Sequence, residues 1–473
     1  MSMNRIKFGT GGFRGIIGED FSKETVTIVA SALSRIMLEE DSKKEIVIGF
    51  DRRNKSPEAA LDMALVFTYY GIKVFLANKD VPTPCIIYHT MAKKEDYGIM
   101  ITASHNPANF NGVKVFTKGG YDADEEFTSR LEQKCQEIKN IYSLGLGEAK
   151  GKGLLAEFDA LTPYIDFILP FSKKHLTHDL KIAYDNLNGV GINSIEPILK
   201  KIGVKTLSIL NPEHDITFKG KLPNPIEKNL KDLSSFVTNN KYDVGFSADS
   251  DADRLGVIDE KGNFVTANEI LACIYYYLIK VRGLKGDIVK NCATSMLLDD
   301  LANKLGYKCH EVDVGFKNIT RKMDECNALL GGESSGGLTC RNYLKGKDTT
   351  FALVLFVNMM DDINKPVSEI VKEVKEFASF KSFDYETFLN YPPSKEKMIK
   401  EYLENNSPDF VRPFIKKEII DRNYRYFFSP SEWCLLRLSN TEPALRLYLE
   451  IDDPNLLKEE ENRIAAYIKK LGE

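Results

Sequence analysis

The stretch TASHNP at residues 102–107 places a serine and a histidine directly after the apolar run YGIMI. The apolar run predicts a buried strand. Asn106-Pro107 predicts a turn after it, because proline restricts the preceding residue and has no N–H for a strand ladder. Ser104 therefore stands where a strand ends, in the position of a candidate nucleophile. Taken alone, the stretch is explained more simply by Ser, Thr and Asn acting as turn or helix caps.

An acidic loop, SADSDADRLGV, provides a candidate metal site, because Asp249, Asp251 and Asp253 alternate with small residues. Three carboxylates this close repel one another, and a hard divalent cation such as Mg²⁺ relieves the repulsion. Together with Glu260 they also fit positions 1, 3, 5 and 12 of an EF-hand calcium loop. However, Arg254 occupies the position where that loop needs glycine, and the flanking segments are predicted to be strands and not helices. A solvated acidic turn is the other alternative. The regular alternation favours a metal site.

Two glycine-rich loops carry polar side chains. GGESSGG at 331–337 presents Glu333 and Ser335 among glycines that let backbone approach a ligand closely, which suits a grip on sugar hydroxyls. FGTGGFRG at 8–15 carries Arg14 but lacks the GxxxxGK[ST] spacing, so it does not indicate nucleotide binding. An ordinary glycine-rich turn explains either loop when it is taken alone.

The stretch RLSNTEPALRLY at 437–448 carries two guanidinium groups and several neutral donors on either side of a predicted turn. Arginine forks and hydroxyl groups are the donors that a phosphate dianion selects. A surface turn with solvated arginines is the alternative. The candidate phosphate-binding residues are Arg437, Ser439, Asn440, Thr441 and Arg446.

The elements that would position these loops follow a βαβ rhythm. Between residues 46 and 78 an apolar run is followed by a polar loop, a helix that begins at Ser56-Pro57, and a second apolar run after Gly71. Similar junctions of helix, glycine and strand recur at Gly203 and Gly306. We therefore predict three related α/β units with mixed, mainly parallel sheets.

The last part of the chain loses this rhythm after Met359. It combines the strand-like runs WCLLRLS and ALRLYLEI with a terminal amphipathic helix, which predicts a C-terminal α+β domain. The predicted domain bounds are 1–150, 155–265, 266–375 and 384–473.

Length and composition indicate a globular protein of several domains. The chain has 473 residues, 43% of them hydrophobic and 28% charged, and its net charge of −4 argues against binding to nucleic acid or a membrane surface through bulk charge. The N-terminus lacks the apolar stretch of a signal peptide, and no run approaches the about 18 apolar residues of a membrane span. The eight scattered cysteines form no CxxC pair. We expect a cytoplasmic protein; its oligomeric state, monomer or dimer, stays open.

A serine, a cation site, a hydroxyl grip and a phosphate clamp together suit phosphoryl transfer on a phosphorylated polyol. The motifs FGTGGFRG, TASHNPANFNGVK, DSDADR, GGESSGG and RLSNTEPALRLY resemble, in this order, those of the α-D-phosphohexomutase family, the phosphoglucomutase and phosphomannomutase group. The resemblance covers essentially the whole chain. It implies four domains around a central cleft, each contributing one loop.

The resemblance also implies an isomerase mechanism. Ser104 would carry a phosphoryl group as phosphoserine, and one Mg²⁺ per active site would be held by the three aspartates and an oxygen of Ser104. The phosphoryl group would pass to a hexose 1-phosphate, giving a 1,6-bisphosphate that returns its other phosphate to the serine. Glucose 1,6-bisphosphate would be both intermediate and activator.

Further roles follow from matching positions of the family pattern. Arg14, His105 and Lys114 would surround the phosphoserine. Either Lys114 or Arg14 would assist proton transfer, and the high basicity of arginine favours the lysine. The residues expected to contact the substrate are Arg254, Lys317, Glu333, Ser335, Arg437, Ser439, Asn440, Thr441 and Arg446.

The sequence features that bear on which sugar is the substrate disagree with one another. Phe316-Lys317 resembles glucose-type members, whereas Asn440 is common among mannose-type ones, and Gly337 stands where many members have histidine. We predict a phosphoglucomutase with mannose as a further substrate. The alternatives are a phosphomannomutase, phosphoglucosamine mutase or phosphopentomutase of the same family and, with less support, a phosphoserine-dependent sugar phosphatase, which needs no second phosphate clamp. A non-catalytic sugar-phosphate binder would tolerate loss of the serine or an aspartate, and neither is lost.

Overall fold

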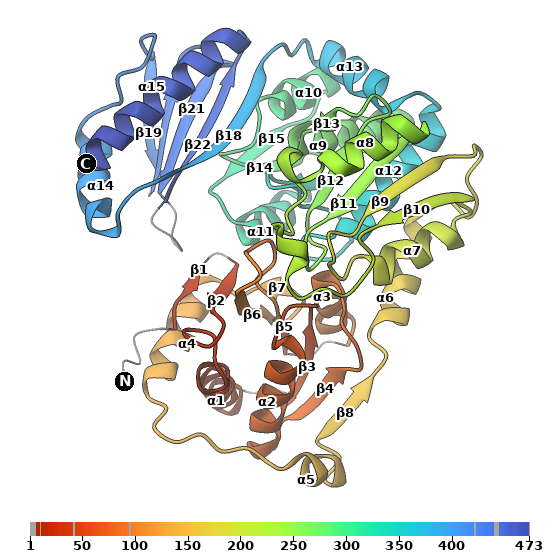
Figure 1. Cartoon of the computed structure of the whole chain (residues 1–473), viewed down its shortest axis with the longest axis vertical. Helices are drawn as coiled ribbons and strands as arrows, with labels where there is room; N and C mark the ends of the chain where they lie inside the picture. The colour runs from red at the N-terminus through yellow and green to blue at the C-terminus, as the bar shows by residue number, and fades with distance from the viewer. Residues whose placement is uncertain are drawn as a thin grey trace. The chain divides into compact units, whose positions relative to one another are not determined.

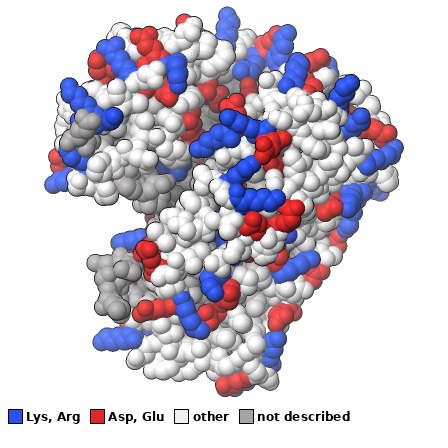
Figure 2. Space-filling model, viewed as in Figure 1, with Lys and Arg blue, Asp and Glu red and all other residues white. Residues whose placement is uncertain are grey.

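The computed structural model describes residues 6–9, 11–40, 43–93, 96–420, 422–438 and 444–472 (Figure 1). They divide into two compact units. The first comprises Met1–Asn291 and Tyr307–Val374, and the second comprises Cys292–Gly306 and Lys375–Glu473. None of the described helices is both long and apolar enough to cross a membrane. On the face drawn in Figure 2, basic and acidic side chains are interspersed.

The first sheet carries the strand after which Ser104 lies. Its strand order is β1-β2-β6-β5-β3-β4-β8, and β7 pairs with β6. The strands are β1 (Phe8–Gly9), β2 (Gly12–Ile16), β3 (Glu45–Phe50), β4 (Lys73–Ala77), β5 (Tyr97–Ile101), β6 (Phe110–Thr117), β7 (Tyr121–Asp122) and β8 (Leu155–Phe158). The associated helices are α1 (Lys23–Glu39), α2 (Ser56–Tyr69), α3 (Thr83–Ala92), α4 (Glu125–Gln136) and α5 (Leu146–Gly151).

The second sheet, ordered β10-β9-β11-β12-β13, carries the acidic loop between β11 and β12. Its strands are β9 (Lys181–Asp185), β10 (Thr206–Leu210), β11 (Val244–Ala248), β12 (Leu255–Ile258) and β13 (Phe264–Val265). Its helices are α6 (Leu161–Ile168), α7 (Ile192–Lys201) and α8 (Lys231–Asn240).

The third sheet, ordered β15-β14-β16-β17, carries GGESSGG at the end of β16 and in the turn before β17. Its strands are β14 (Ile288–Asn291), β15 (Cys309–Val312), β16 (Leu330–Gly332) and β17 (Leu338–Cys340). The helices in this part of the sequence are α9 (Ala267–Tyr276), α10 (Leu297–Leu305), α11 (Phe316–Cys326), α12 (Thr349–Ile363) and α13 (Val367–Ala378), of which α10 belongs to the second compact unit.

One strand order recurs in the three sheets. Four strands of each sheet form this repeat, and they lie in the spatial order second, first, third, fourth. The strands are β4-β3-β5-β6 in the first sheet, β10-β9-β11-β12 in the second and β15-β14-β16-β17 in the third, and the fourth strand runs antiparallel to the third. The pairs among the first three strands are parallel. Gly71, Gly203 and Gly306 take positive φ values of 76°, 94° and 82° between helix and strand, which is the reason glycine recurs there. The prediction of three related α/β units with mixed, mainly parallel sheets is confirmed.

The C-terminal residues form an antiparallel sheet of order β18-β22-β21-β20-β19, with α15 across it (Figure 1). The predicted α+β class is confirmed. The elements are β18 (Phe383–Asn390), α14 (Glu396–Asn405), β19 (Lys416–Ile420), β20 (Asn423–Phe427), β21 (Trp433–Leu438), β22 (Ala444–Ile451) and α15 (Pro454–Gly472). A separate core that includes Leu436, Leu447 and Ile464 lies between the sheet and these helices.

Candidate active site

Ser104 lies just beyond the buried strand β5 and is itself 1% exposed. Its φ of 50° is in the left-handed region, which is uncommon for a residue other than glycine. The Ser104 N–H donates to the Thr102 hydroxyl oxygen at 2.8 Å, and the Thr102 hydroxyl donates to Asp51 at 2.6 Å. The serine is therefore fixed in an unusual backbone conformation.

The Ser104 side chain reaches the acidic loop of the second sheet. Its hydroxyl donates to Asp249 Oδ2 at 2.6 Å, and His105 Nδ1 lies 3.3 Å from the same Ser104 oxygen. The first contact joins the β5–β6 and β11–β12 hairpins.

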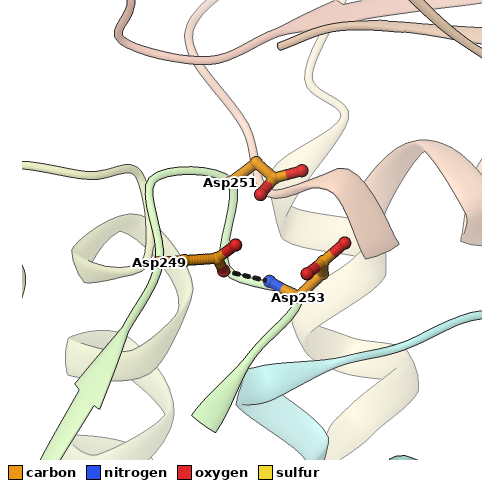
Figure 3. A group of neighbouring side chains, drawn as sticks. All are labelled: Asp249, Asp251 and Asp253. Carbon is orange, nitrogen blue, oxygen red and sulfur yellow. Dashed lines mark hydrogen bonds between the residues drawn. The ribbon is translucent and has the colours of Figure 1, made fainter. Parts of the chain in front are cut away.

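The three aspartates converge on one another, as Figure 3 shows. They are at most 3% exposed, and one carboxylate oxygen from each lies within 4.8 Å of the others. Asp249 Oδ1 accepts the N–H groups of Asp253 at 2.9 Å and Arg254 at 3.1 Å. Burial first, and then repulsion from Asp253 and Asp251, raise the pKa of Asp249 well above its usual value.

The chemistry of this cluster fits a divalent cation. Asp251 Oδ1 and Asp253 Oδ1 are buried and accept no hydrogen bond from the residues that the structure describes. Buried carboxylate oxygens without a donor are costly, and a hard cation such as Mg²⁺ prefers oxygen ligands of this kind. The Thr83 hydroxyl, which no sequence motif indicated, donates to Asp251 Oδ2 at 2.5 Å.

Lys114 neutralises part of the acidic charge. Its ammonium group lies 2.6 Å from Asp251 Oδ2 and 2.8 Å from Asp253 Oδ2. Burial lowers the pKa of Lys114, but the two carboxylates outweigh it and hold the pKa above the usual value. Burial opposes ionisation of Asp251, yet the contact with Lys114 keeps the pKa of that carboxyl below its usual value.

Two arginines lie at the edge of the same cluster. Arg14 on β2 donates to the Asn106 side-chain oxygen at 2.5 Å, and burial followed by repulsion from Arg254 lowers its pKa to about 10. Arg254 Nε lies 4.0 Å from Asp249 Oδ2 and 3.9 Å from Asp253 Oδ1. These pKa directions run against the preference for Lys114 in proton transfer, so both Lys114 and Arg14 stay candidates.

The third sheet brings Glu333 and Ser335 together. The Ser335 hydroxyl donates to Glu333 Oε1 at 2.6 Å, and the Asn291 side chain donates to Glu333 Oε2 at 3.0 Å. Lys317, at the start of α11, forms an ion pair at 3.2 Å with Glu125.

A residue that the sequence did not indicate, Lys347, links this loop to the acidic loop. Its ammonium group lies 3.4 Å from Asp253 Oδ1 and 3.7 Å from Glu333 Oε1. A Cβ placed on Gly337 would meet Lys347 Cδ at 2.1 Å. The lysine stem therefore occupies the space beside Gly337, which accounts for glycine at this position.

The predicted phosphate clamp lies in the second unit. Arg437 on β21 and Arg446 on β22 are directly opposite each other, and Arg446 stacks on Phe388 at 4.8 Å. Like charges that face each other across strands destabilise a sheet, so an anion between them would be favourable. Ser439, Asn440 and Thr441 lie outside the described residues.

Comparisons with known proteins agree with this architecture. Models of the phosphoglucomutase/phosphomannomutase family match residues 5–142 (alpha/beta/alpha domain I), 162–262 (domain II), 266–377 (domain III) and 417–467 (C-terminal domain). A phosphoglucomutase/phosphomannomutase family protein from Burkholderia thailandensis has a similar fold, with a TM-score of 0.81 at 21% identity over 100% of this chain and 98% of its own.

Two relatives come from Thermococcus kodakarensis. A probable phosphoglucosamine mutase is 29% identical over 98% of both chains, and a phosphoglucomutase/phosphomannomutase is 29% identical over 94% of both. A phosphoglucosamine mutase from Clostridioides difficile is 26% identical over 98% of both chains. With family models matching all four domains, the chain belongs to the phosphoglucomutase/phosphomannomutase family and is a phosphohexomutase-type isomerase.

Proposed function

We propose that the protein interconverts the 1-phosphate and 6-phosphate of a hexose, with Ser104 as the phosphoryl carrier. The observation that carries the proposal is the 2.6 Å contact between the Ser104 hydroxyl and Asp249, inside a buried cluster of three carboxylates. A phosphatase would share this cluster but has no need of the facing arginines Arg437 and Arg446. They support an enzyme that grips the phosphate that is not being transferred.

In the proposed reaction, phosphorylated Ser104 donates its phosphoryl group to the free hydroxyl of a hexose 1-phosphate. The bond between phosphorus and Oγ breaks, a bond to the sugar oxygen forms, and the hydroxyl proton passes to a basic group of the site. The bisphosphate then turns, and its other phosphoryl group passes back to Ser104 Oγ. The bond between phosphorus and the sugar oxygen breaks, and the basic group returns the proton to that oxygen. Lys114 and Arg14 are the candidates for the proton transfer, and His105 would be a further neighbour of the phosphoserine.

The other roles follow from the placement of the side chains. Asp249, Asp251 and Asp253 would hold Mg²⁺ with an oxygen of the phosphoserine, and the ion would offset the charge of the transferring group. Glu333 and Ser335 would bind sugar hydroxyls, with Arg254 and Lys317 as further substrate contacts. The non-transferring phosphate would be bound by Arg437, Ser439, Asn440, Thr441 and Arg446.

For the sugar, we propose glucosamine ahead of glucose. The support is that one relative, from Clostridioides difficile, is a phosphoglucosamine mutase and another, from Thermococcus kodakarensis, is named a probable phosphoglucosamine mutase. Glucose is the second candidate, because Phe316-Lys317 resembles glucose-type members and a second Thermococcus kodakarensis relative at the same identity is a phosphoglucomutase/phosphomannomutase. The activator would be the 1,6-bisphosphate of the same sugar.

The test supplies Mg²⁺, a trace of hexose 1,6-bisphosphate and, in parallel, glucosamine 6-phosphate, glucose 1-phosphate and mannose 1-phosphate. The isomeric product and free phosphate are measured together, with Ser104→Ala as the control. The proposal expects an isomer without free phosphate, fastest with glucosamine and lost in Ser104→Ala. Stoichiometric free phosphate, or turnover that survives the loss of Ser104, would overturn it.

A further inference from the structure

Arg53 is a fully buried arginine that lies outside the predicted site. It follows β3 and is 1% exposed. Its guanidinium group donates to four backbone carbonyls of the turn that carries the serine. The acceptors are the oxygens of Ser104, Asn106 at 2.6 Å, Pro107 at 2.8 Å and Phe110 at 3.1 Å.

The remaining sides of the guanidinium group are also covered. Arg53 Nε lies 3.4 Å from Asp51 Oδ2, which balances the charge. The Phe218 ring, which comes from the region of the second sheet, lies 5.0 Å from the Arg53 carbon Cζ. A buried charge is costly unless it is paired and hydrogen-bonded. Here Asp51 pairs with the charge, and Nη1 and Nη2 make all the hydrogen bonds of the guanidinium group, while Nε makes none with the residues that the structure describes.

The same group of contacts reaches the acidic loop. The Ser250 hydroxyl, between two of the three aspartates, donates to the Ser104 carbonyl oxygen at 2.5 Å and lies 3.3 Å from Asp51 Oδ2. The Ser104 carbonyl oxygen thus accepts hydrogen bonds from both Arg53 and Ser250. Fixing this carbonyl fixes the peptide that follows Ser104.

The backbone of Ser104 needs such support. Its φ of 50° is disfavoured for a residue with a Cβ, and such conformations persist only where the surroundings impose them. In this conformation the hydroxyl points to Asp249 Oδ2. If the turn relaxed, the hydroxyl would leave the acidic cluster.

We propose that Arg53 is a positioning residue for phosphoryl transfer: its fork of donors holds residues 104–110 so that the Ser104 oxygen stays aimed at the acidic loop. The inference rests on the proposed function. Arg53 acts through the backbone and touches no reacting atom. A lysine has three donors on one nitrogen and no planar fork, so it cannot reproduce the set of contacts.

The experiment compares Arg53→Ala and Arg53→Lys with Arg52→Ala. Arg52 is the matched control, because its guanidinium group pairs with Asp80 at 2.8 Å and donates to the Pro212 carbonyl at 3.1 Å instead. Three quantities are measured for each protein: kcat and KM, the single-turnover rate of transfer from phosphorylated Ser104, and the melting temperature. Guanidinium ion is added below the onset of unfolding.

We expect both Arg53 variants to lose about 100-fold in kcat and in the single-turnover rate, with KM nearly unchanged. Guanidinium ion should restore part of the rate of Arg53→Ala, while Arg52→Ala should keep its kcat. If Arg53→Ala does not fold, Arg53→Lys, which keeps the charge and most of the volume, carries the test. A folded Arg53 variant with normal kcat, or a loss matched by the unfolded fraction and not restored by guanidinium ion, would overturn the proposal.

Failure of this inference can be told apart from failure of the proposed function. Turnover that survives Ser104→Ala refutes the serine mechanism, whatever Arg53 does. An inactive Ser104→Ala beside a fully active Arg53→Lys refutes the positioning role alone.

Discussion

Ser104 and Asp249 lie 145 positions apart in the chain, yet the Ser104 hydroxyl donates a 2.6 Å hydrogen bond to the Asp249 carboxylate. Each follows the third strand of its repeat, β5 or β11, in the turn before an antiparallel fourth strand. The GGESSGG loop follows β16 in the corresponding place. One recurring strand order therefore delivers the serine, the acidic loop and the Glu333 loop at equivalent turns.

Asp249→Asn should stabilise the protein without metal while it abolishes activity. Three buried carboxylates repel one another, and an asparagine oxygen can still accept the N–H groups of Asp253 and Arg254. We expect the free energy of unfolding in EDTA to rise by about 1 kcal/mol, as often occurs when a strained active site is relaxed.

The measurement is thermal unfolding of both proteins in EDTA and in Mg²⁺. Mg²⁺ should raise the melting temperature of the wild type, because it binds the folded state, and should have a much smaller effect on Asp249→Asn. Equal stabilisation of both proteins by Mg²⁺ would contradict a metal site that includes Asp249.

Lys347→Met should weaken substrate binding and turnover. The ammonium group lies 3.4 Å from Asp253 Oδ1 and 3.7 Å from Glu333 Oε1, so its loss removes a positive charge from beside both carboxylates. Loss of a residue that orients a metal ligand typically lowers metal affinity or activity about 10- to 100-fold, and we expect a decrease of this size in kcat/KM. The control is Lys345→Met, since Lys345 pairs with Asp324 instead. Equal kcat/KM in the two variants would refute the role of Lys347.

Much of the fold was predictable because its signals are local. The βαβ rhythm, the glycines between helix and strand, and the turn after YGIMI each depend on neighbouring residues. β18, β19 and β20 were not predicted: FDYETFLN, the sequence of β18, alternates between exposed and half-buried positions without an apolar run. Its partner β22 supplies the register, and that pairing spans about 60 residues of chain.

The residues of the candidate site also divide into those that local motifs predict and those that only the folded structure reveals. Ser104, the three aspartates and Glu333 were selected because their motifs are compact and follow apparent strands. Arg53, Thr83 and Lys347 were missed, because their partners lie in other parts of the sequence: Thr83, for example, bonds Asp251, 168 positions away. Such residues look like ordinary loop residues until packing of the sheets brings their partners beside them.

Arg446→Gln should remove the anion dependence of stability. Arg437 and Arg446 face each other in the antiparallel pair β21–β22, and a phosphate between them would relieve their repulsion. Inorganic phosphate should raise the melting temperature of the wild type more than that of the variant. The KM for the hexose phosphate should rise about tenfold, the usual effect of losing one charged hydrogen bond.

The control for this change is Arg463→Gln, whose guanidinium group pairs with Asp409 at the surface of α15. It should keep both the wild-type KM and the wild-type response to phosphate. A phosphate response in Arg446→Gln as large as in the wild type would exclude Arg446 from the clamp.

The lowered pKa of His89 should make the protein less stable in mild acid. Its Nε2 lies 2.7 Å from the Ala160 carbonyl oxygen, and burial lowers its pKa to about 4. As the pH falls below about 6.5, the unfolded chain binds a proton that the folded protein excludes until about pH 4. The free energy of unfolding therefore decreases over this interval, by about 2 kcal/mol at about pH 5.

The measurement is urea unfolding of the wild type and His89→Gln at about pH 7.5 and about pH 5. The glutamine amide can still donate to the Ala160 carbonyl but does not titrate, so the wild type should lose about 2 kcal/mol more on acidification than the variant. Asp348, whose pKa burial raises to about 6, titrates in the same interval with the opposite sign. Because Asp348 is present in both proteins, its contribution cancels in the difference, and an equal loss of stability in both would refute the assignment to His89.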